Sequence, residues 1–213
     1  MRRPCISSFS AQTATSMTRI LVIFFLLLAA QASADTGEES FLLHTPVAST
    51  LLDGFRIWDS LEHKWRALRA GEAPAKKAAV LVVHIWADYC KPCRQEMPLL
   101  RDFAQRLTQE HAGKVAVIYV AETPSSLEMD RFLIEEQSRM PRAPQYLDTD
   151  EKLAQLIRAN RPSRELTLPI TLLLDEQRVI RQAVIGPMAA SRAALFAGVA
   201  KLVHLTGSVT PRP

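Results

Sequence analysis

Apolar segments along the chain predict buried strands that alternate with amphipathic helices. Val80–Trp86 and Val115–Val120 are apolar at almost every position, which is typical of strands covered on both faces in a parallel sheet. Between them, residues 94–110 carry apolar side chains at three- and four-residue spacing, the pattern of a helix with one buried face. The sequence therefore predicts a strand, a helix and a parallel strand in succession.

Weaker patterns predict further elements on both sides of this unit. They are a hairpin of residues 55–58 and 64–68, a helix at about 125–138, a short strand at 142–147, a helix at 150–159, a second hairpin of 169–175 and 178–185, and a closing helix at 189–205. We expect Leu127, Phe132 and Leu133 to face the core, and Asp148 or Thr149 to cap the helix at 150–159. This order of elements indicates an α/β fold.

The N-terminus has the features of a secretory signal peptide. The apolar run Ile20–Ala30 follows a basic residue and precedes Ala32-Ser33-Ala34, a small-residue cleavage site. The run is shorter than the roughly 20 apolar residues that a membrane-spanning helix needs. We expect cleavage between Ala34 and Asp35, with Met17 as an alternative start. The mature protein is expected to be periplasmic or otherwise extracytoplasmic.

The chain is predicted to have four parts: a signal peptide (1–34), an N-terminal extension with the first hairpin (35–78), one main domain (79–206) and a disordered tail (207–213).

The charge of the chain indicates no nucleic-acid partner. The formal net charge is +4, and removing Arg2, Arg3 and Arg19 with the signal peptide leaves +1. A nearly neutral protein lacks the electrostatic footprint of one that binds nucleic acid or an anionic membrane surface. The cluster of Arg158, Arg161 and Arg164 is interpreted as a solvated helix end.

Two cysteines form a CxxC motif just after the first buried strand. Cys5 leaves with the signal peptide, so Cys90 and Cys93 are the thiols expected in the mature chain. A disulfide across so short a loop stabilises a fold little, which favours a redox role. Structural zinc needs four ligands, and the sequence has no second CxxC or nearby histidine pair. We expect no metal, and no cofactor other than the redox-active disulfide itself.

The motif opens a predicted helix, which gives its two cysteines different roles. Unpaired N–H groups and the positive end of the helix dipole stabilise a thiolate at a helix N-terminus. We therefore predict that Cys90 is the nucleophile, with a pKa lowered from about 8.5 toward roughly 3.5–7.5. Lys91 adds a positive charge beside it. Cys93, one turn further in, is the expected resolving thiol.

Two separated motifs resemble the thioredoxin superfamily. The segment Trp86–Pro98, read as WADYCKPCRQEMP, is similar to its active-site segment, and the Glu-Met-Pro ending resembles the exported TlpA/ResA-like branch. Leu168-Pro169-Ile170-Thr171, followed by Asp175 and Gly186, resembles the family's cis-proline loop, hairpin and strand-ending glycine. The resemblance covers roughly residues 80–205. It implies a thioredoxin fold: a central mixed sheet flanked by helices, with a helical insertion before the cis-proline hairpin.

The resemblance also implies roles for individual residues. Pro169 would be cis and lie against the CxxC pair, and the backbone of Leu168 would pair with an extended substrate. Trp86 and Tyr89 would contact the substrate as well. Pro92, before the second cysteine, resembles the proline of reducing thioredoxins more than the motif of strong oxidases.

The activity that the resemblance implies is disulfide exchange with exported proteins that carry disulfides or thiols. The reducing direction is favoured, as in cytochrome c maturation by some TlpA/ResA-like proteins, with an upstream membrane protein as electron donor. One alternative is a copper-handling module in which both thiols and a histidine bind Cu(I), although a third ligand near the motif is not evident. Another is a peroxiredoxin-type peroxidase, whose threonine-containing cysteine loop is not found here.

His84 and Glu96 are the polar residues whose roles the sequence leaves open. His84 falls six residues before Cys90, where thioredoxins carry a buried acid, and could relay a proton to or from Cys93. A hydrogen-bonded core histidine is the alternative, and the favoured one. Glu96 is interpreted as a first-turn residue that interacts with the helix dipole.

Overall fold

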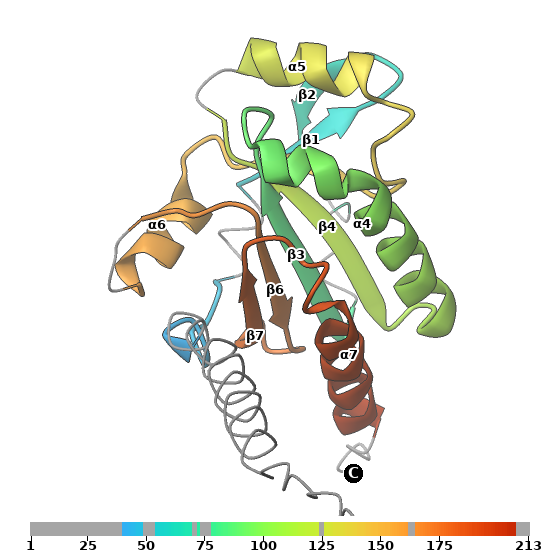
Figure 1. Cartoon of the computed structure of the whole chain (residues 1–213), viewed down its shortest axis with the longest axis vertical. Coiled ribbons are helices and arrows are strands. Elements are labelled where there is room, and N and C mark those ends of the chain that lie inside the picture. The colour runs from blue at the N-terminus through green and yellow to red at the C-terminus, as the bar shows by residue number, and fades with distance from the viewer. Residues whose placement is uncertain are drawn as a thin grey trace, which may run out of the picture. The chain divides into compact units, whose positions relative to one another are not determined.

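A seven-stranded mixed sheet forms the centre of the protein (Figure 1). The computed structural model describes residues 40–48, 54–69, 72, 78–123, 126–161 and 165–207. The predicted signal peptide and residues 208–213 of the predicted tail lie outside these ranges. No helix in the described ranges is both long enough and apolar enough to cross a membrane.

The strands lie in the order β2-β1-β5-β4-β3-β6-β7. They are β1 Arg56–Asp59, β2 Lys64–Ala67, β3 Val80–Trp86, β4 Val115–Ala121, β5 Gln145–Leu147, β6 Ile170–Leu174 and β7 Ile180–Ile185. The pairs β3–β4 and β4–β5 are parallel, and the other pairs are antiparallel. The predicted N-terminal hairpin is β1–β2, which joins the main sheet through β5 and therefore extends it.

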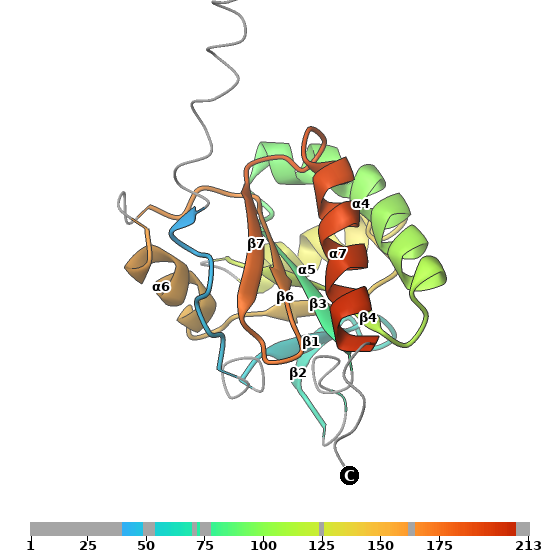
Figure 2. The same ribbon diagram turned by 90° about the horizontal axis from the view of Figure 1, so that it is seen from below.

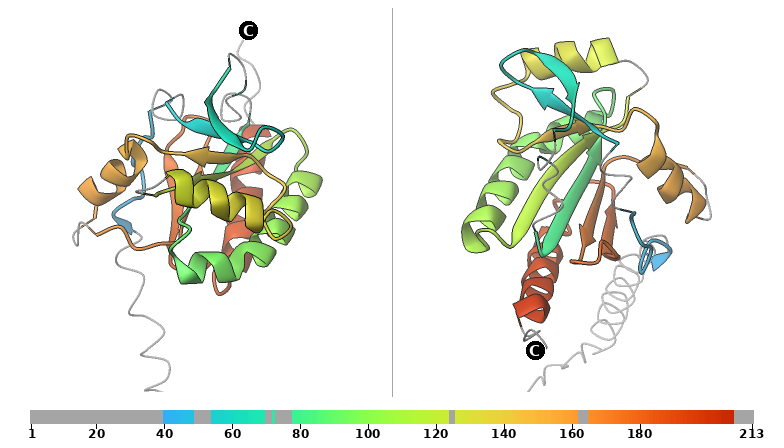
Figure 3. Two further views of the ribbon diagram at one scale, coloured as in Figure 1. Left: turned by 90° about the horizontal axis from the view of Figure 1, so that it is seen from above. Right: turned by 180° about the vertical axis from the view of Figure 1, so that it is seen from behind.

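Helices cover both faces of the sheet (Figures 2 and 3). They are α4 Lys91–Glu110, α5 Ser126–Glu135, α6 Lys152–Ala159 and α7 Arg192–Gly207. Buried side chains of α4, α5 and α7 share one apolar cluster with one face of the sheet, and those of α6 share a second cluster with the other face. The segment α5-β5-α6 lies between β4 and β6, so the predicted thioredoxin fold with a helical insertion before the hairpin is confirmed.

Strand β3 is buried along its whole length because both faces of the sheet are covered there. Val80, Val82 and Trp86 belong to the cluster beneath α4 and α7, and the alternate residues Leu81, Val83 and Ile85 belong to the cluster beneath α6. This follows from the two-residue repeat of a strand. Its nearly continuous apolar sequence is thereby explained.

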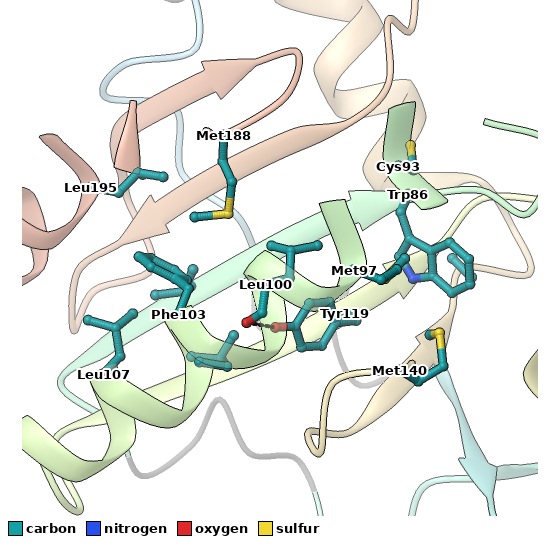
Figure 4. Packing of buried hydrophobic residues seen from close by; sticks show 14 of the residues in the cluster. Trp86, Cys93, Met97, Leu100, Phe103, Leu107, Tyr119, Met140, Met188 and Leu195 are labelled. Carbon is teal, nitrogen blue, oxygen red and sulfur yellow. Dashed lines mark hydrogen bonds between the residues drawn. The ribbon is translucent and has the colours of Figure 1, made fainter. Parts of the chain in front are cut away.

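The side chains between α4 and the sheet interlock closely (Figure 4). Met97, Leu100, Phe103 and Leu107 of α4 point down onto the sheet, where the Tyr119 hydroxyl of β4 donates a hydrogen bond of 3.1 Å to the Leu100 carbonyl. That bond provides a partner for a polar group in an apolar environment. Helix α4 is thereby held in place on the face of the sheet where β3 ends.

Two details of the helices differ from the sequence predictions. Leu127 is 69% exposed, so its prediction as a core residue is wrong, whereas Leu133 is buried and Phe132 packs against the core as predicted. Arg161 is only 3% exposed, and its guanidinium donates to the Glu165 carbonyl, so the predicted solvated helix end is wrong at that residue.

The cap of α6 is confirmed. The carboxylate of Asp148 accepts hydrogen bonds from the backbone N–H groups of Lys152 (3.1 Å) and Leu153 (2.7 Å). Asp148 thus satisfies donors that have no partner within the first turn of a helix.

The orientation of α5 can be tested with the same substitution at two of its positions. Leu133→Ala removes a side chain that is 3% exposed and should lower the free energy of unfolding by about 2–5 kcal/mol. Leu127→Ala, at an exposed position, should change it by less than about 0.5 kcal/mol. Urea denaturation followed by circular dichroism measures both. Equal losses in the two variants would contradict the observed orientation.

Candidate functional site

The CxxC motif lies at the junction of the longest fully buried strand and the longest helix among the described residues. β3 ends at Trp86, and α4 begins at Lys91 with Cys90 as its N-cap. The Cys90 sulfur accepts a hydrogen bond of 3.3 Å from the Cys93 backbone N–H. The two cysteines form a disulfide. Because β3 cannot move without disturbing both apolar clusters, the position of the motif is fixed by the core.

The two sulfur-bearing residues differ in access to solvent. Cys90 is 8% exposed and Cys93 is 0% exposed. A partner thiol or disulfide can therefore reach Cys90 but not Cys93, as in the roles predicted from the sequence. Lys91 and Pro92 occupy the first two positions of α4 and are exposed. Proline is favoured there because the first N–H groups of a helix have no intrahelical partner.

The predicted cis-proline segment lies at the same end of the sheet. The Leu168–Pro169 peptide bond is cis. β6 pairs with β3 so that Ile170 lies opposite Ile85, which places Pro169 level with the end of β3. The Pro169 carbonyl accepts a hydrogen bond of 2.8 Å from the Gly186 N–H, and half-buried Leu168 packs against the cluster that contains both cysteines.

The two predicted aromatic contacts of the substrate lie in different environments. Tyr89 is 65% exposed at the tip of the loop before Cys90. Trp86 is fully buried, with its ring tilted against that of Phe132 at a centroid distance of 5.6 Å. The Trp86 side chain therefore belongs to the core (Figure 4), beneath the surface that a substrate meets.

A buried pair of titratable groups lies on the α4 face of the sheet. His84 is 1% exposed, and its Nδ1 lies 3.0 Å from the Thr171 hydroxyl. Its Nε2 lies 3.5 Å from Oε1 of Glu96, which is 6% exposed. Burial lowers the pKa of His84 to about 3 and raises the pKa of Glu96 to about 7, the latter opposed by a hydrogen bond from the Met188 N–H. His84 is therefore a neutral, hydrogen-bonded core residue at neutral pH.

Glu96 is not the first-turn residue interacting with the helix dipole that the sequence suggested, because α4 begins at Lys91 and its first turn contains no acidic residue. It belongs to the inward face of α4, three residues after Cys93 and next to buried Met97 and Leu100. Residues three apart on a helix are neighbours, so Glu96 lies one turn after Cys93 on the same buried face of α4. A carboxylate at an apolar position of the helical repeat was the signal that could have identified it.

The structure contains a second buried pair, of two carboxyl groups, that the sequence did not predict. Glu122 and Asp148 follow the last residues of parallel neighbours β4 and β5, and each is 5% exposed. Burial, and then the charge of Asp148, raise the pKa of Glu122 to about 8, so Glu122 is protonated at neutral pH and hydrogen-bonded to Asp148. The Glu122 N–H donates to the Trp86 carbonyl at 2.8 Å, which ties this pair to the start of the CxxC loop.

The donor groups of the site do not form a metal centre. Over the described ranges, no group of three or more His, Cys, Asp and Glu side chains is positioned to hold a metal ion. The copper-handling alternative therefore has no ligand set of that kind in the described part of the chain.

Comparison with known proteins identifies similar sequences and folds. The chain is 30% identical over 116 residues to "Thioredoxin-like protein YneN" of Bacillus subtilis (strain 168), covering 53% of this chain and 59% of that protein. It is 24% identical over 116 residues to "Sporulation thiol-disulfide oxidoreductase A" of the same organism, covering 54% of this chain and 65% of that protein. The matched segments thus span about three fifths of these relatives.

A solved structure agrees with the fold. The thioredoxin-related protein from Neisseria meningitidis serogroup B superposes with a TM-score of 0.51 at 22% identity, over 70% of this chain and 98% of that one. The sequence profile of the AhpC/TSA family matches residues 62–183, a range that contains the CxxC motif and Pro169. The match covers more than half of the chain, and the protein therefore belongs to the AhpC/TSA family, with the thioredoxin-like fold that its sequence predicted.

Proposed function

We propose that this protein is an exported thiol-disulfide oxidoreductase that reduces disulfides of other exported proteins. The observation that carries the proposal is the position of Cys90, accessible and at the N-cap of α4, with its disulfide partner Cys93 buried behind it. The family and the thioredoxin-like fold support the same activity.

The catalytic cycle uses the two sulfurs in turn. The Cys90 thiolate attacks one sulfur of a substrate disulfide, so that a mixed disulfide forms and the first substrate thiolate leaves and takes a proton from water. Cys93 then loses its proton and attacks the Cys90 sulfur, which releases the second substrate thiol and leaves the Cys90–Cys93 disulfide. Thiols of an upstream membrane electron donor regenerate the dithiol by the same exchange.

Glu96 is the proposed proton acceptor for the resolving step. Cys93 is inaccessible to water, so its proton must pass to a neighbouring group before it can attack. The Glu96 carboxyl is one turn away, and burial raises its pKa to about 7, a value at which it can both accept and return a proton. His84, held by Thr171, positions that carboxyl and remains uncharged.

Export and the reducing direction are part of the proposal. The apolar run Ile20–Ala30 with its small-residue cleavage site supports export to an extracytoplasmic compartment. The proline in Cys90-Lys91-Pro92-Cys93 supports the reducing direction. Apocytochromes c are one class of exported substrate that the TlpA/ResA-like resemblance suggests.

The role of each cysteine predicts distinct mutant behaviour. The purified protein should reduce insulin disulfides, and Cys90→Ser should abolish the reaction because the accessible nucleophile is lost. Cys93→Ser should instead accumulate a mixed disulfide with substrate, because the resolving thiol is missing. Mass spectrometry under non-reducing conditions distinguishes the two variants. Insulin reduction by Cys90→Ser at the wild-type rate would reject the mechanism.

The direction of electron flow can be measured by equilibration with glutathione buffers. A reduction potential near the value of about −270 mV found for thioredoxin is expected, and one near −120 mV would mark an oxidant instead.

The function of Glu96 predicts a pH profile. The rate of mixed-disulfide resolution should rise through about pH 7 in the wild type, and Glu96→Gln should lose that inflection. Stopped-flow measurement of substrate thiol release follows this step. Glu110→Gln, at an exposed position of the same helix, is the matched control. If the pH profile of Glu96→Gln kept the same inflection, the inflection would belong to a group other than Glu96.

The stability of the Glu96→Gln variant provides an independent test of the raised pKa. Between about pH 4.5 and 7 the folded protein keeps a proton on Glu96 that the unfolded chain has released, so stability falls as pH rises through this window. In Glu96→Gln, the free energy of unfolding should fall less steeply with pH than in the wild type, by up to about 1.4 kcal/mol per pH unit. Urea denaturation of the oxidised proteins at several pH values measures the difference.

A further inference from the structure

A groove with an apolar floor begins one residue from the nucleophile. It lies between the first two turns of α4 and the end of α5 with the turn that follows, and its volume is about 420 Å³. Its apolar lining consists of exposed Pro98 and half-buried Phe132, with the buried side chains of Met97 and Met140 beneath them.

The rim of this groove is basic. Lys91, Arg94 and Arg139 line it, and the single carboxylate in the lining, Glu136, pairs with Arg139 at 3.1 Å. Three cations and one carboxylate leave an excess of two positive charges. No carboxylate of the described residues lies within ion-pair distance of Lys91 or Arg94. The positive end of the α4 helix dipole adds to the positive electrostatic potential along this rim.

The charges on the other side of Cys90 have the opposite sign. Burial raises the pKa of the Tyr89 hydroxyl, and the charges of Asp88 and Glu151 add to that effect, whereas Arg158 opposes it. With Glu122 protonated at neutral pH, two carboxylates and one guanidinium act near Tyr89, whereas the groove has an excess of positive charge. A bound polypeptide with a carboxylate on one side of its cysteine is favoured in one orientation and disfavoured in the other.

We propose that this groove selects substrates in which acidic and apolar residues flank the reacting cysteine on one side. The occupant is an extended segment of the substrate, with an apolar side chain against Pro98 and Phe132 and carboxylates beside Arg94 and Arg139. This inference rests on the proposed thiol-disulfide exchange and specifies its substrate class. Arg139 is a specificity-determining residue, although the rest of α4, β4 and α5 separate it from Cys93 in the sequence.

The test compares model peptides with one disulfide and a leucine beside the reacting cysteine. Two glutamates stand after the cysteine in one peptide and before it in a second, and lysines replace them in two matched peptides. The wild type should prefer one of the two glutamate peptides over its lysine counterpart by about three- to tenfold in kcat/KM at low salt, and the preference should shrink at high salt.

Variants of Arg139 then test whether this residue causes the preference for the glutamate peptide. Arg139→Glu should bring the glutamate-to-lysine ratio close to one, and Arg139→Lys should preserve it. Lys114→Glu, an equal charge change at an exposed site beyond the far end of α4, should also preserve it. The ratio cancels any change in the reactivity of Cys90 itself. No preference in the wild type, or an unchanged ratio in Arg139→Glu, would overturn the inference.

The small neutral substrate 2-hydroxyethyl disulfide separates this inference from the proposed function. If the wild-type protein reduces this small disulfide but does not discriminate between the peptides, the proposed function stands and the proposed role of the groove in substrate selection is wrong. Protein that reduces neither the small disulfide nor any peptide refutes both.

Discussion

The position of the reactive sulfur depends on the burial of β3 on both faces. Each residue of this strand except His84 contributes to one of two apolar clusters, so its end at Trp86 is determined by the packing of four helices. The chain then turns within a few residues into α4, which is itself held on the sheet by Met97, Leu100 and the Tyr119 hydrogen bond. Cys90 lies between these two rigid elements. Its geometry relative to Pro169 follows from the β3–β6 register rather than from the loop alone.

The same burial makes the polar groups beneath the motif expensive to ionise. His84, Glu96 and Glu122 lie in a protein interior where a charge without a close partner is strongly disfavoured. All three are therefore shifted toward their neutral forms: histidine toward lower pKa, and the carboxyls toward higher pKa. The carboxylate of Asp148 accepts hydrogen bonds from two backbone N–H groups of α6. The interior thus contains proton donors and acceptors with little buried charge near the disulfide.

Features encoded by local sequence were predictable, and features set by distant segments were not. The CxxC motif, the helix it opens and the Leu168-Pro169 segment are short motifs whose residues carry their own geometry. The exposed position of Leu127 depends on what α5 packs against, which its own weak apolar pattern does not determine. Glu122 is buried because Asp148 arrives beside it from the inserted segment, 26 positions later in the sequence. Glu96 could have been found, since it interrupts an otherwise apolar helical face, but its proximity to the dipole offered a simpler interpretation.

Solvent exposure divides the groups around the disulfide into two sets with different physical behaviour. The exposed cations Lys91, Arg94 and Arg139 interact across water, so their effect on a partner decreases with salt and each can be replaced at small cost to stability. The pKa values of Glu96 and His84 come from burial, which salt hardly screens, and replacing either group disturbs the core. In the proposed mechanism, substrate selection should therefore depend on ionic strength, whereas proton transfer from Cys93 should not. On that proposal, surface substitutions alone would change the substrate class and leave the chemistry of the two sulfurs intact.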